Sequence, residues 1–175
     1  MRFRWCRLVG GVRAISLHTG VLTDRPFPDQ SFDAITMVDF IEHVRDPIVE
    51  MAEARERLAP GGVLAVSTPR VDSVARRMLG SAWPQYREEH VSYLTRDGLR
   101  RLLGRAGLSR LSVRTTRKAV TLAYVHGQGA TYPMRFVTPI VAGAYRALPP
   151  ARHIVWRLPF GEMTIIATRS GDERA

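Results

Sequence analysis

The sequence predicts an α/β fold in which buried strands alternate with helices. Two short apolar segments, 34–38 and 63–66, are bounded by turn residues, as expected of strands buried on both faces of a sheet. A helical pattern lies between them, and two buried strands joined by a helix form a right-handed parallel crossover. Two later segments, 111–114 and 162–168, also have the composition of strands.

Length and composition are those of one globular domain. A chain of 175 residues is large enough for a real core, and its apolar fraction of 45% is ordinary. No apolar run approaches the ~20 residues that span a bilayer, and arginines interrupt the N-terminal segment where a secretory signal would need an apolar core. Cys6, the single cysteine, cannot form an internal disulfide, which favours the cytoplasm.

The net charge of +10 would normally indicate nucleic acid or an anionic membrane as a partner. Lys118 is the only lysine, however, and the arginines are scattered along the chain. The segment richest in cations, 96–118, has no aromatic residue on which bases could stack. The sequence therefore argues against nucleic-acid binding.

The N-terminal third is predicted to contain one strand before the first buried segment. Apolar residues between 12 and 17 favour a short strand that ends at Thr19-Gly20, whereas residues 1–11 show no clear period. The proline-containing segment PFPDQSF at 26–32 is predicted to be a turn.

The helix between the two buried strands is predicted to begin at Asp46-Pro47. Asp46 can accept hydrogen bonds from the first backbone amides, and Pro47 suits the first helical position. Glu50 puts a favourable negative charge in the first turn. Glu53 and Arg57 are four residues apart and are expected to pair on the exposed face. The residues expected on the buried face are Ile48, Met51, Ala52 and Leu58.

Caps and helix breakers predict the remaining elements. Pro60-Gly61-Gly62 is expected to end the first helix, and residues 70–93 to form a helix followed by a loop. Thr95 is expected to cap a further helix that ends at Gly107. Its buried stripe would be Leu99, Leu102, Leu103 and Ala106. Prolines divide residues 118–160, where we expect a helix near 141–148 and a loop at His126-Gly127-Gln128-Gly129.

Three motifs together resemble class I S-adenosylmethionine (SAM) methyltransferases of the type 11 and ubiquinone-pathway kind. They are FPDQSFDAI at 27–35, DFIEHVRDP at 39–47 and LAPGGVLAVSTP at 58–69. The segment 81–108 resembles the family's next stretch, and GEMTIIATRS at 161–170 is similar to its closing antiparallel strand. The resemblance implies a Rossmann-like, mostly parallel sheet with an antiparallel C-terminal strand. In a single domain, 1–175, segments 20–117 and 161–169 would be core, and 118–160 a variable insertion on the substrate side.

The segment upstream of these motifs departs from the family pattern. Family members open with a strand, a glycine-rich loop that cradles the cofactor, and a further strand ending in an acid that binds the ribose. Gly10-Gly11 precedes the wrong element for such a loop. We therefore expect an incomplete, truncated methyltransferase sheet without its first βαβ unit, with weak SAM binding and an unpaired strand edge. A start codon placed too far downstream is the alternative explanation.

The resemblance implies SAM as the cofactor, along the carboxyl ends of the parallel strands. The residues beside the adenine would be Gly20, Val21 and Leu22. Val21 stands where the family often has an acidic residue that accepts a hydrogen bond from the adenine amino group. In this chain, backbone groups or Asp24 would have to accept that hydrogen bond. The residues beside the methionine part and the transferred methyl would be Val38, Asp39 and Phe40.

A polar constellation follows the first buried strand. Asp39, Glu42 and His43 form an Asp-x-x-Glu-His pattern, which places the three side chains on one face of a helical turn, and His90 follows later. A similar Glu-x-x-Glu-His turn with a later histidine is associated with a divalent metal in small-RNA 2′-O-methyltransferases and ubiquinone-pathway O-methyltransferases. The resemblance thus implies these four residues as metal ligands. In the metal-free alternative, Glu42 or His43 holds the turn, and His43 or His90 is the general base.

The predicted function is SAM-dependent methyl transfer to an oxygen or nitrogen atom of a small molecule or glycan, impaired in this chain. The catalytic residues would be His43, His90 and Glu42. Residues 118–160 are expected to shape the acceptor pocket. The alternative is a non-catalytic interaction or dimerisation module, because an exposed strand edge favours pairing with a second copy.

Overall fold

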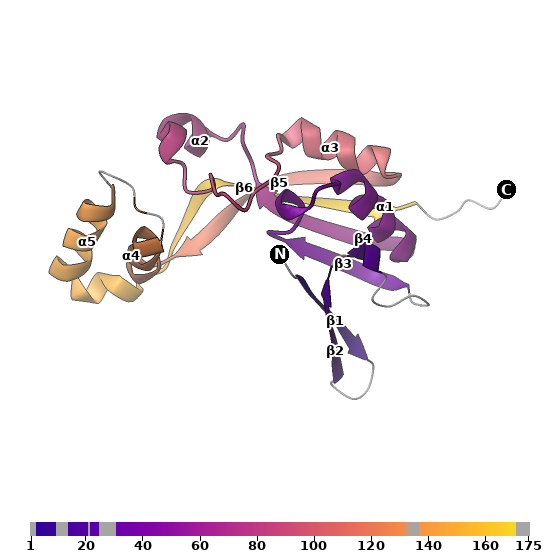
Figure 1. Ribbon diagram of the computed structural model, residues 1–175, viewed down its shortest axis with the longest axis horizontal. Coiled ribbons are helices and arrows are strands. Elements are labelled where there is room, and N and C mark those ends of the chain that lie inside the picture. The colour runs from indigo at the N-terminus through magenta and orange to yellow at the C-terminus, as the bar shows by residue number, and fades with distance from the viewer. Residues whose placement is uncertain are drawn as a thin grey trace.

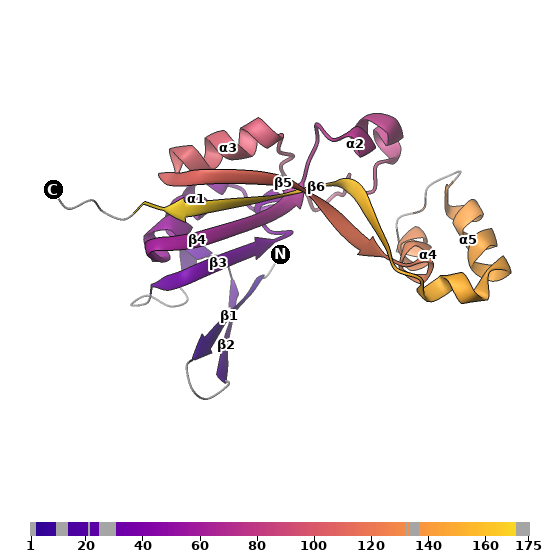
Figure 2. The ribbon, with the colours of Figure 1, turned by 180° about the vertical axis from the view of Figure 1, so that it is seen from behind.

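The computed structural model describes residues 3–9, 14–20, 22–24, 31–131, 133 and 137–170 of the chain. In this part of the chain, a four-stranded sheet carries α1 (Pro47–Arg57) and α3 (Arg96–Arg105) on one face (Figure 1). Seen from behind, the strands lie in front of both helices, so the described helices cover one face only (Figure 2). No described helix is long and apolar enough to cross a bilayer.

The main sheet has the strand order β3-β4-β6-β5. Its strands are β3 (Phe32–Val38), β4 (Leu58–Pro69), β5 (Leu108–Val120) and β6 (Trp156–Arg169). β3 and β4 are parallel, with Met37 opposite Val66, which confirms the predicted crossover. β6 runs antiparallel to both β4 and β5, as expected for the closing strand.

The prediction that β3 is buried on both faces is wrong. Ile35 and Met37 are buried. Ala34, Thr36 and Val38, which alternate with them, are exposed. Successive side chains of a strand point to opposite faces, and the described helices cover just one of these faces. Within the described residues β3 also has a single neighbour, β4, so the predicted open edge lies here.

α1 begins where its cap predicts. Asp46 Oδ1 accepts hydrogen bonds from the N–H groups of Ile48 and Val49, each at 3.1 Å. The helix ends earlier than predicted, because Leu58 is already extended and pairs with β3. Pro60-Gly61-Gly62 therefore lies within β4 instead of ending the helix, and Gly61 provides a positive φ of 79° there.

The buried face of α1 differs in part from the predicted stripe. Met51 and Ala54 are fully buried, whereas Ile48 is 41% exposed. The predicted Glu53–Arg57 pair forms at 2.9 Å, but both side chains are largely buried rather than exposed. The core between helices and sheet includes the fully buried residues Met51, Leu58, Leu64, Val66, Leu99, Leu103, Met163 and Ile165.

α3 confirms its predicted signals. Thr95 Oγ1 accepts a hydrogen bond from Gly98 N–H at 2.9 Å, and Gly107 ends the element with a φ of 78°. The predicted stripe of Leu99, Leu102, Leu103 and Ala106 is buried. This helix therefore packs on the sheet through the face that the sequence indicates.

Several helices lie beyond the carboxyl ends of the parallel strands (Figure 1). They are α2 (Val74–Leu79), η3 (Gly80–Ala82), α4 (Leu122–Thr131), α5 (Val137–Ala147) and η4 (Pro149–His153). The loop predicted at residues 126–129 is wrong, because this segment belongs to α4. A Cβ on Gly129 would lie 3.2 Å from the side chain of Thr138, so glycine here allows α5 to pack closely on α4.

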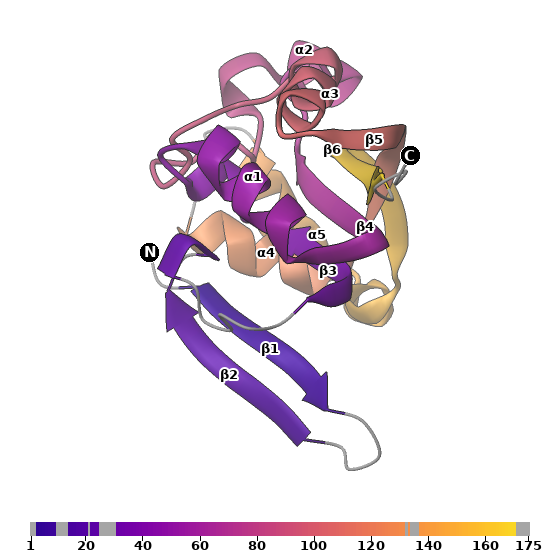
Figure 3. The same cartoon turned by 90° about the vertical axis from the view of Figure 1, so that its right-hand side faces the viewer.

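A hairpin precedes the sheet and projects away from it (Figure 3). It consists of β1 (Phe3–Val9) and β2 (Ala14–Gly20), paired antiparallel, and is followed by η1 (Leu22–Asp24). The strand predicted to end at Gly20 is confirmed. Its partner β1 lies in a segment whose sequence shows no clear period.

Candidate functional site

The carboxyl ends of β3 and β4 lie side by side and form a rim. Val38 is opposite Ser67, and the N–H of Asp39 donates to the Ser67 carbonyl at 3.1 Å. Asp39 has a φ of 48°, a left-handed conformation that few non-glycine residues adopt. Val38 is 68% exposed and Asp39 is exposed, whereas Phe40 is buried. The rim therefore presents one apolar side chain and one carboxylate to solvent.

Glu42 lies in the short helix η2 (Ile41–His43) directly after this rim. Its side chain is buried, and Oε2 accepts a hydrogen bond from Thr68 Oγ1 at 3.0 Å. Oε1 is also buried and has no hydrogen-bond partner among the described residues. Burial raises the pKa of Glu42, although its backbone and Thr68 hydrogen bonds act against that effect.

His43 and His90 meet beside Glu42. Their rings are in edge contact, with centroids 4.7 Å apart. His43 Nδ1 lies 2.9 Å from the carbonyl oxygen of Glu89, and since a carbonyl can only accept, Nδ1 carries the proton. His90 Nδ1 is buried without a hydrogen-bond partner in the described part of the chain. Burial, followed by the nearby His43, lowers the pKa of His90.

The backbone of η2 holds the segment that carries His90. The Glu42 carbonyl accepts hydrogen bonds from the N–H groups of Val91, at 2.9 Å, and Ser92, at 3.2 Å. Residues far apart in the sequence are thereby fixed around one point, and Glu42, His43 and His90 offer ligand atoms within 4.8 Å of one another. Asp39, which the sequence pattern adds to this set, is not part of the group. The three residues could hold a metal ion or exchange a proton.

The segment predicted to lie beside the adenine is attached to α1 through Glu50. The buried Leu22 donates its N–H to Glu50 Oε2 at 3.2 Å, and Thr23 Oγ1 donates to Oε1 at 3.0 Å. Burial raises the pKa of Glu50 against these hydrogen bonds. Gly20 is partly buried, and Val21 lies outside the described residues.

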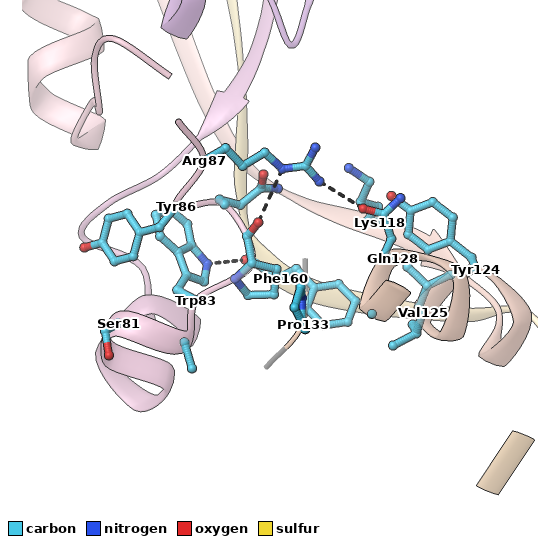
Figure 4. Close-up of a pocket in the computed structure, with 15 residues that line it drawn as sticks. Ser81, Trp83, Tyr86, Arg87, Lys118, Tyr124, Val125, Gln128, Pro133 and Phe160 are labelled. Atoms are coloured by element: carbon cyan, nitrogen blue, oxygen red, sulfur yellow. Dashed lines mark hydrogen bonds between the residues drawn. The ribbon is translucent and has the colours of Figure 1, made fainter. Parts of the chain in front are cut away.

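A cavity of about 350 Å³ lies between residues 81–87 and α4. Both walls are visible in Figure 4, where Arg87 reaches across to Gln128 on α4. The sequence analysis expects residues 118–160 to shape the acceptor pocket; of these residues, Lys118 and part of α4 are among those that line this cavity. Arg87 and Trp83, which the sequence prediction did not place there, also line it. The single lysine of the chain is the one sequence signal that could have drawn attention to this place.

Comparisons with known proteins agree on one family. A family model described as a methyltransferase domain matches residues 10–113, which is more than half of the chain. Ubiquinone biosynthesis O-methyltransferases from Cereibacter sphaeroides and Dinoroseobacter shibae are 31% and 30% identical to this chain over 86 residues. Each match covers 45% of this chain and 35% of the relative, so the chain spans about a third of the length of the curated relatives it matches.

A solved structure supports the same fold. A SAM-dependent methyltransferase from Thermotoga maritima superposes with a TM-score of 0.52 and 21% sequence identity. The superposition covers 83% of this chain and 59% of that protein. Together with the strand order and the family match, this shows a Rossmann-like methyltransferase sheet. The chain therefore belongs to the methyltransferase domain family, within the class I SAM-dependent methyltransferases.

Proposed function

We propose that this chain transfers a methyl group from SAM to an oxygen or nitrogen atom of a small-molecule or glycan acceptor. The observation that carries the proposal is the position of Glu42, His43 and His90, which gather directly beyond the ends of two parallel strands. Open sheets of this kind bind ligands at the carboxyl ends of their strands. The curated relatives are O-methyltransferases, which favours an oxygen acceptor.

The rim residues fit the methionine half of SAM. Val38 offers an exposed apolar surface for the methylene groups, and Asp39 offers a carboxylate for the ammonium group. Leu22 and Gly20 would border the adenine, held in place by Glu50. Bound SAM supplies a methyl group on a positively charged sulfur. An acceptor atom attacks this methyl group in line with its bond to sulfur, so placement of the acceptor accounts for much of the rate.

The histidine pair would take the proton that the acceptor loses. Because His43 Nδ1 donates to a carbonyl, its lone pair is on Nε2, and this atom can accept a proton. His90 has a lowered pKa and is neutral at pH 7, so it can serve in the same way. Glu42 would orient both histidines through its backbone and its bond with Thr68.

A more specific version of this proposal includes a divalent metal ion that assists the methyl transfer. Glu42, His43 and His90 would be its ligands, and Glu42 Oε1, which has no hydrogen-bond partner among the described residues, is an acceptor suited to a cation. One carboxylate with two imidazoles suits zinc or iron better than magnesium or manganese. Such an ion lowers the pKa of a bound hydroxyl, which makes an oxygen nucleophile at neutral pH.

The competing proposal is a non-catalytic interaction or dimerisation module. One edge of β3 has no neighbouring strand among the described residues, and this favours the module, since such an edge can add a strand from a second copy. Weak SAM binding would also favour a non-catalytic module. The impaired methyl transfer that the sequence leads us to expect stays a prediction. Sedimentation velocity separates the two, because a module that acts by pairing sediments as a dimer.

The decisive experiment is methyl transfer with radiolabelled SAM to a panel of phenols, amines and sugars. We expect label in at least one acceptor, and a loss of about a hundredfold in His90→Asn if His90 is the base. His153→Asn, an exposed histidine, is the matched control. To test for a metal, we would measure the metal content of the protein and its methyl transfer after chelation, and compare both with those of the Glu42→Gln variant. No transfer to any acceptor, together with no SAM binding, would favour the non-catalytic module.

A further inference from the structure

The cavity between residues 81–87 and α4 has the properties of a small-molecule site. Its volume of about 350 Å³ falls in the range usual for ligand pockets. Its wall is formed mainly by aromatic and apolar residues, among them Trp83, Tyr86, Val120, Tyr124 and Phe160. Trp83 is fixed in the wall, because its Nε1–H donates to the Phe160 carbonyl at 2.8 Å. A flat apolar ring matches such a wall.

The charge of the wall has one sign. Arg87 and Lys118 line the cavity, and no carboxylate is among the described residues that line it. Lys118 Nζ reaches the buried Glu162 at 2.9 Å, and Gln85 Nε2 donates to the same Glu162 oxygen at 2.7 Å. This Glu162 oxygen therefore accepts hydrogen bonds from a neutral amide as well as from Lys118. The Lys118 side chain keeps 31% of its surface exposed. A ligand with a positive charge would meet two cations here.

Arg87 spans the cavity and reaches α4. Its Nη2 donates to the neutral Gln128 Oε1 at 3.2 Å across the cavity (Figure 4). Its Nη1 lies 3.8 Å from Glu89 Oε1, and the Glu89 side chain is partly exposed, so solvent weakens this ion pair. A ligand carboxylate can replace the Gln128 amide oxygen, because a charge-assisted hydrogen bond is stronger than a neutral one.

The cavity also lies next to the rim. Glu162 is opposite Pro69 in the β4–β6 pairing, one residue beyond the Thr68 that bonds Glu42. On the other side, Tyr93 contacts both His90, with ring centroids 5.7 Å apart, and Tyr86 in the cavity wall, at 5.3 Å. These contacts bring the cavity close to the place proposed for the methyl group.

We propose that this cavity binds the methyl acceptor, and that the acceptor is an anionic ring compound held by Arg87 and Lys118. The role as acceptor site rests on the function proposed above. The ligand class rests on the cavity alone: the aromatic wall selects the ring, and the two cations select a carboxylate or an equivalent anion.

Calorimetric titration of the full chain with 2-naphthoate and with its neutral amide, 2-naphthamide, tests the ligand class. We expect 2-naphthoate to bind at least about tenfold more tightly, as a charge-assisted bond should provide. Arg87→Gln and Lys118→Met should each weaken 2-naphthoate binding by about tenfold and leave 2-naphthamide unchanged. Arg117→Gln, an exposed cation next to Lys118 and outside the cavity, should change neither.

Glu162→Gln removes the negative charge that pairs with Lys118, so it should change anion binding in the opposite direction. Glutamine can still accept from Gln85 and Lys118, but the competing negative charge is gone, so 2-naphthoate should bind more tightly. This variant keeps the test valid if Lys118→Met does not fold. No binding of 2-naphthoate, equal affinity for the amide, or an Arg87→Gln variant that behaves like Arg117→Gln would overturn the proposal.

Parallel titration with SAM separates this proposal from the proposed function. Charge-dependent 2-naphthoate binding without SAM binding would support the ligand class and contradict methyl transfer. SAM binding and methyl transfer without any preference for 2-naphthoate over its amide would overturn the ligand class and leave methyl transfer standing.

Discussion

Thr68 donates a hydrogen bond to Glu42 Oε2 over 3.0 Å, and this bond joins the end of β4 to the turn after β3. Both residues are buried. Because the other carboxylate oxygen of Glu42 has no hydrogen-bond partner among the described residues, Thr68 is its one side-chain donor there. The bond therefore connects the two strands that define the rim with the acid at the centre of the site.

Thr68→Val keeps the shape of the side chain and removes the donor. We expect a loss of about 1–3 kcal/mol in the free energy of unfolding, because Glu42 becomes a buried acid without this bond. Burial raises the pKa of Glu42, so between the ordinary and the raised pKa the folded chain binds more protons than the unfolded chain. Stability therefore falls as pH rises through this interval. Thr68→Val should widen the interval and lose more stability at pH 8 than at pH 5.

Urea unfolding at both pH values measures this effect, with Thr68→Ser as the control that retains the hydroxyl. Equal losses for the valine and serine variants would show that the hydroxyl does not matter. A pH-independent loss would show that Glu42 does not titrate through this bond.

His90 should make the protein sensitive to mild acid. Burial lowers its pKa, so between that value and its ordinary value the unfolded chain binds more protons than the folded chain. Stability should therefore be complete above about pH 6.5 and fall as pH decreases through the lowered pKa. His90→Asn should lose less stability between pH 7 and pH 5 than the unchanged protein does. The exposed His153→Asn variant should follow the unchanged protein, and identical curves for all three would contradict the account.

Gly161 is required where β6 passes the cavity wall. It has a φ of 88°, and a Cβ there would overlap the Ser73 side chain and lie 3.1 Å from Trp83 Nε1. Gly161→Ala should cost about 1–3 kcal/mol, through backbone strain and displacement of Trp83. Gly143, in the middle of α5 with open space around it, is the matched control. Gly143→Ala should stabilise by about 0.5–1 kcal/mol, and similar melting temperatures for both variants would refute the packing described at Gly161.

The cap of α1 supports the crossover that brings the rim together. Asp46→Ala removes both hydrogen bonds to the helix start and should cost about 1 kcal/mol. Asp46→Asn retains an acceptor and should cost much less. Thermal unfolding measures both variants, and an alanine variant as stable as the asparagine variant would mean that the cap contributes nothing.

Local signals in the sequence predicted the elements that they encode. The caps Asp46 and Thr95 fixed the starts of α1 and α3, and the apolar segments predicted the parallel pair β3 and β4. The Glu42-His43 turn and the later His90 were also singled out, and the structure brings these three together. Each of these signals needs only a few neighbouring residues or a resemblance in a short motif.

Features that depend on distant contacts were not predicted. Helix α4 contains two glycines, which indicated a loop, yet its packing against α5 outweighs their low helix propensity. The cavity depends on contacts such as Arg87 with Gln128, 41 residues apart, and Gln85 with Glu162, 77 residues apart. The exposure of alternate β3 residues depends on which faces the helices cover, and no pattern within β3 itself carries that information.

The proposed function requires SAM to bind along the rim where β3 and β4 end. Backbone amide NMR during titration with S-adenosylhomocysteine tests it most directly, because each shifted amide reports its own place in the fold. The largest shifts should fall at Val38, Asp39 and Phe40, with a second group at Leu22 and Thr23. Shifts confined to other parts of the chain, or none at saturating ligand, would contradict the claim.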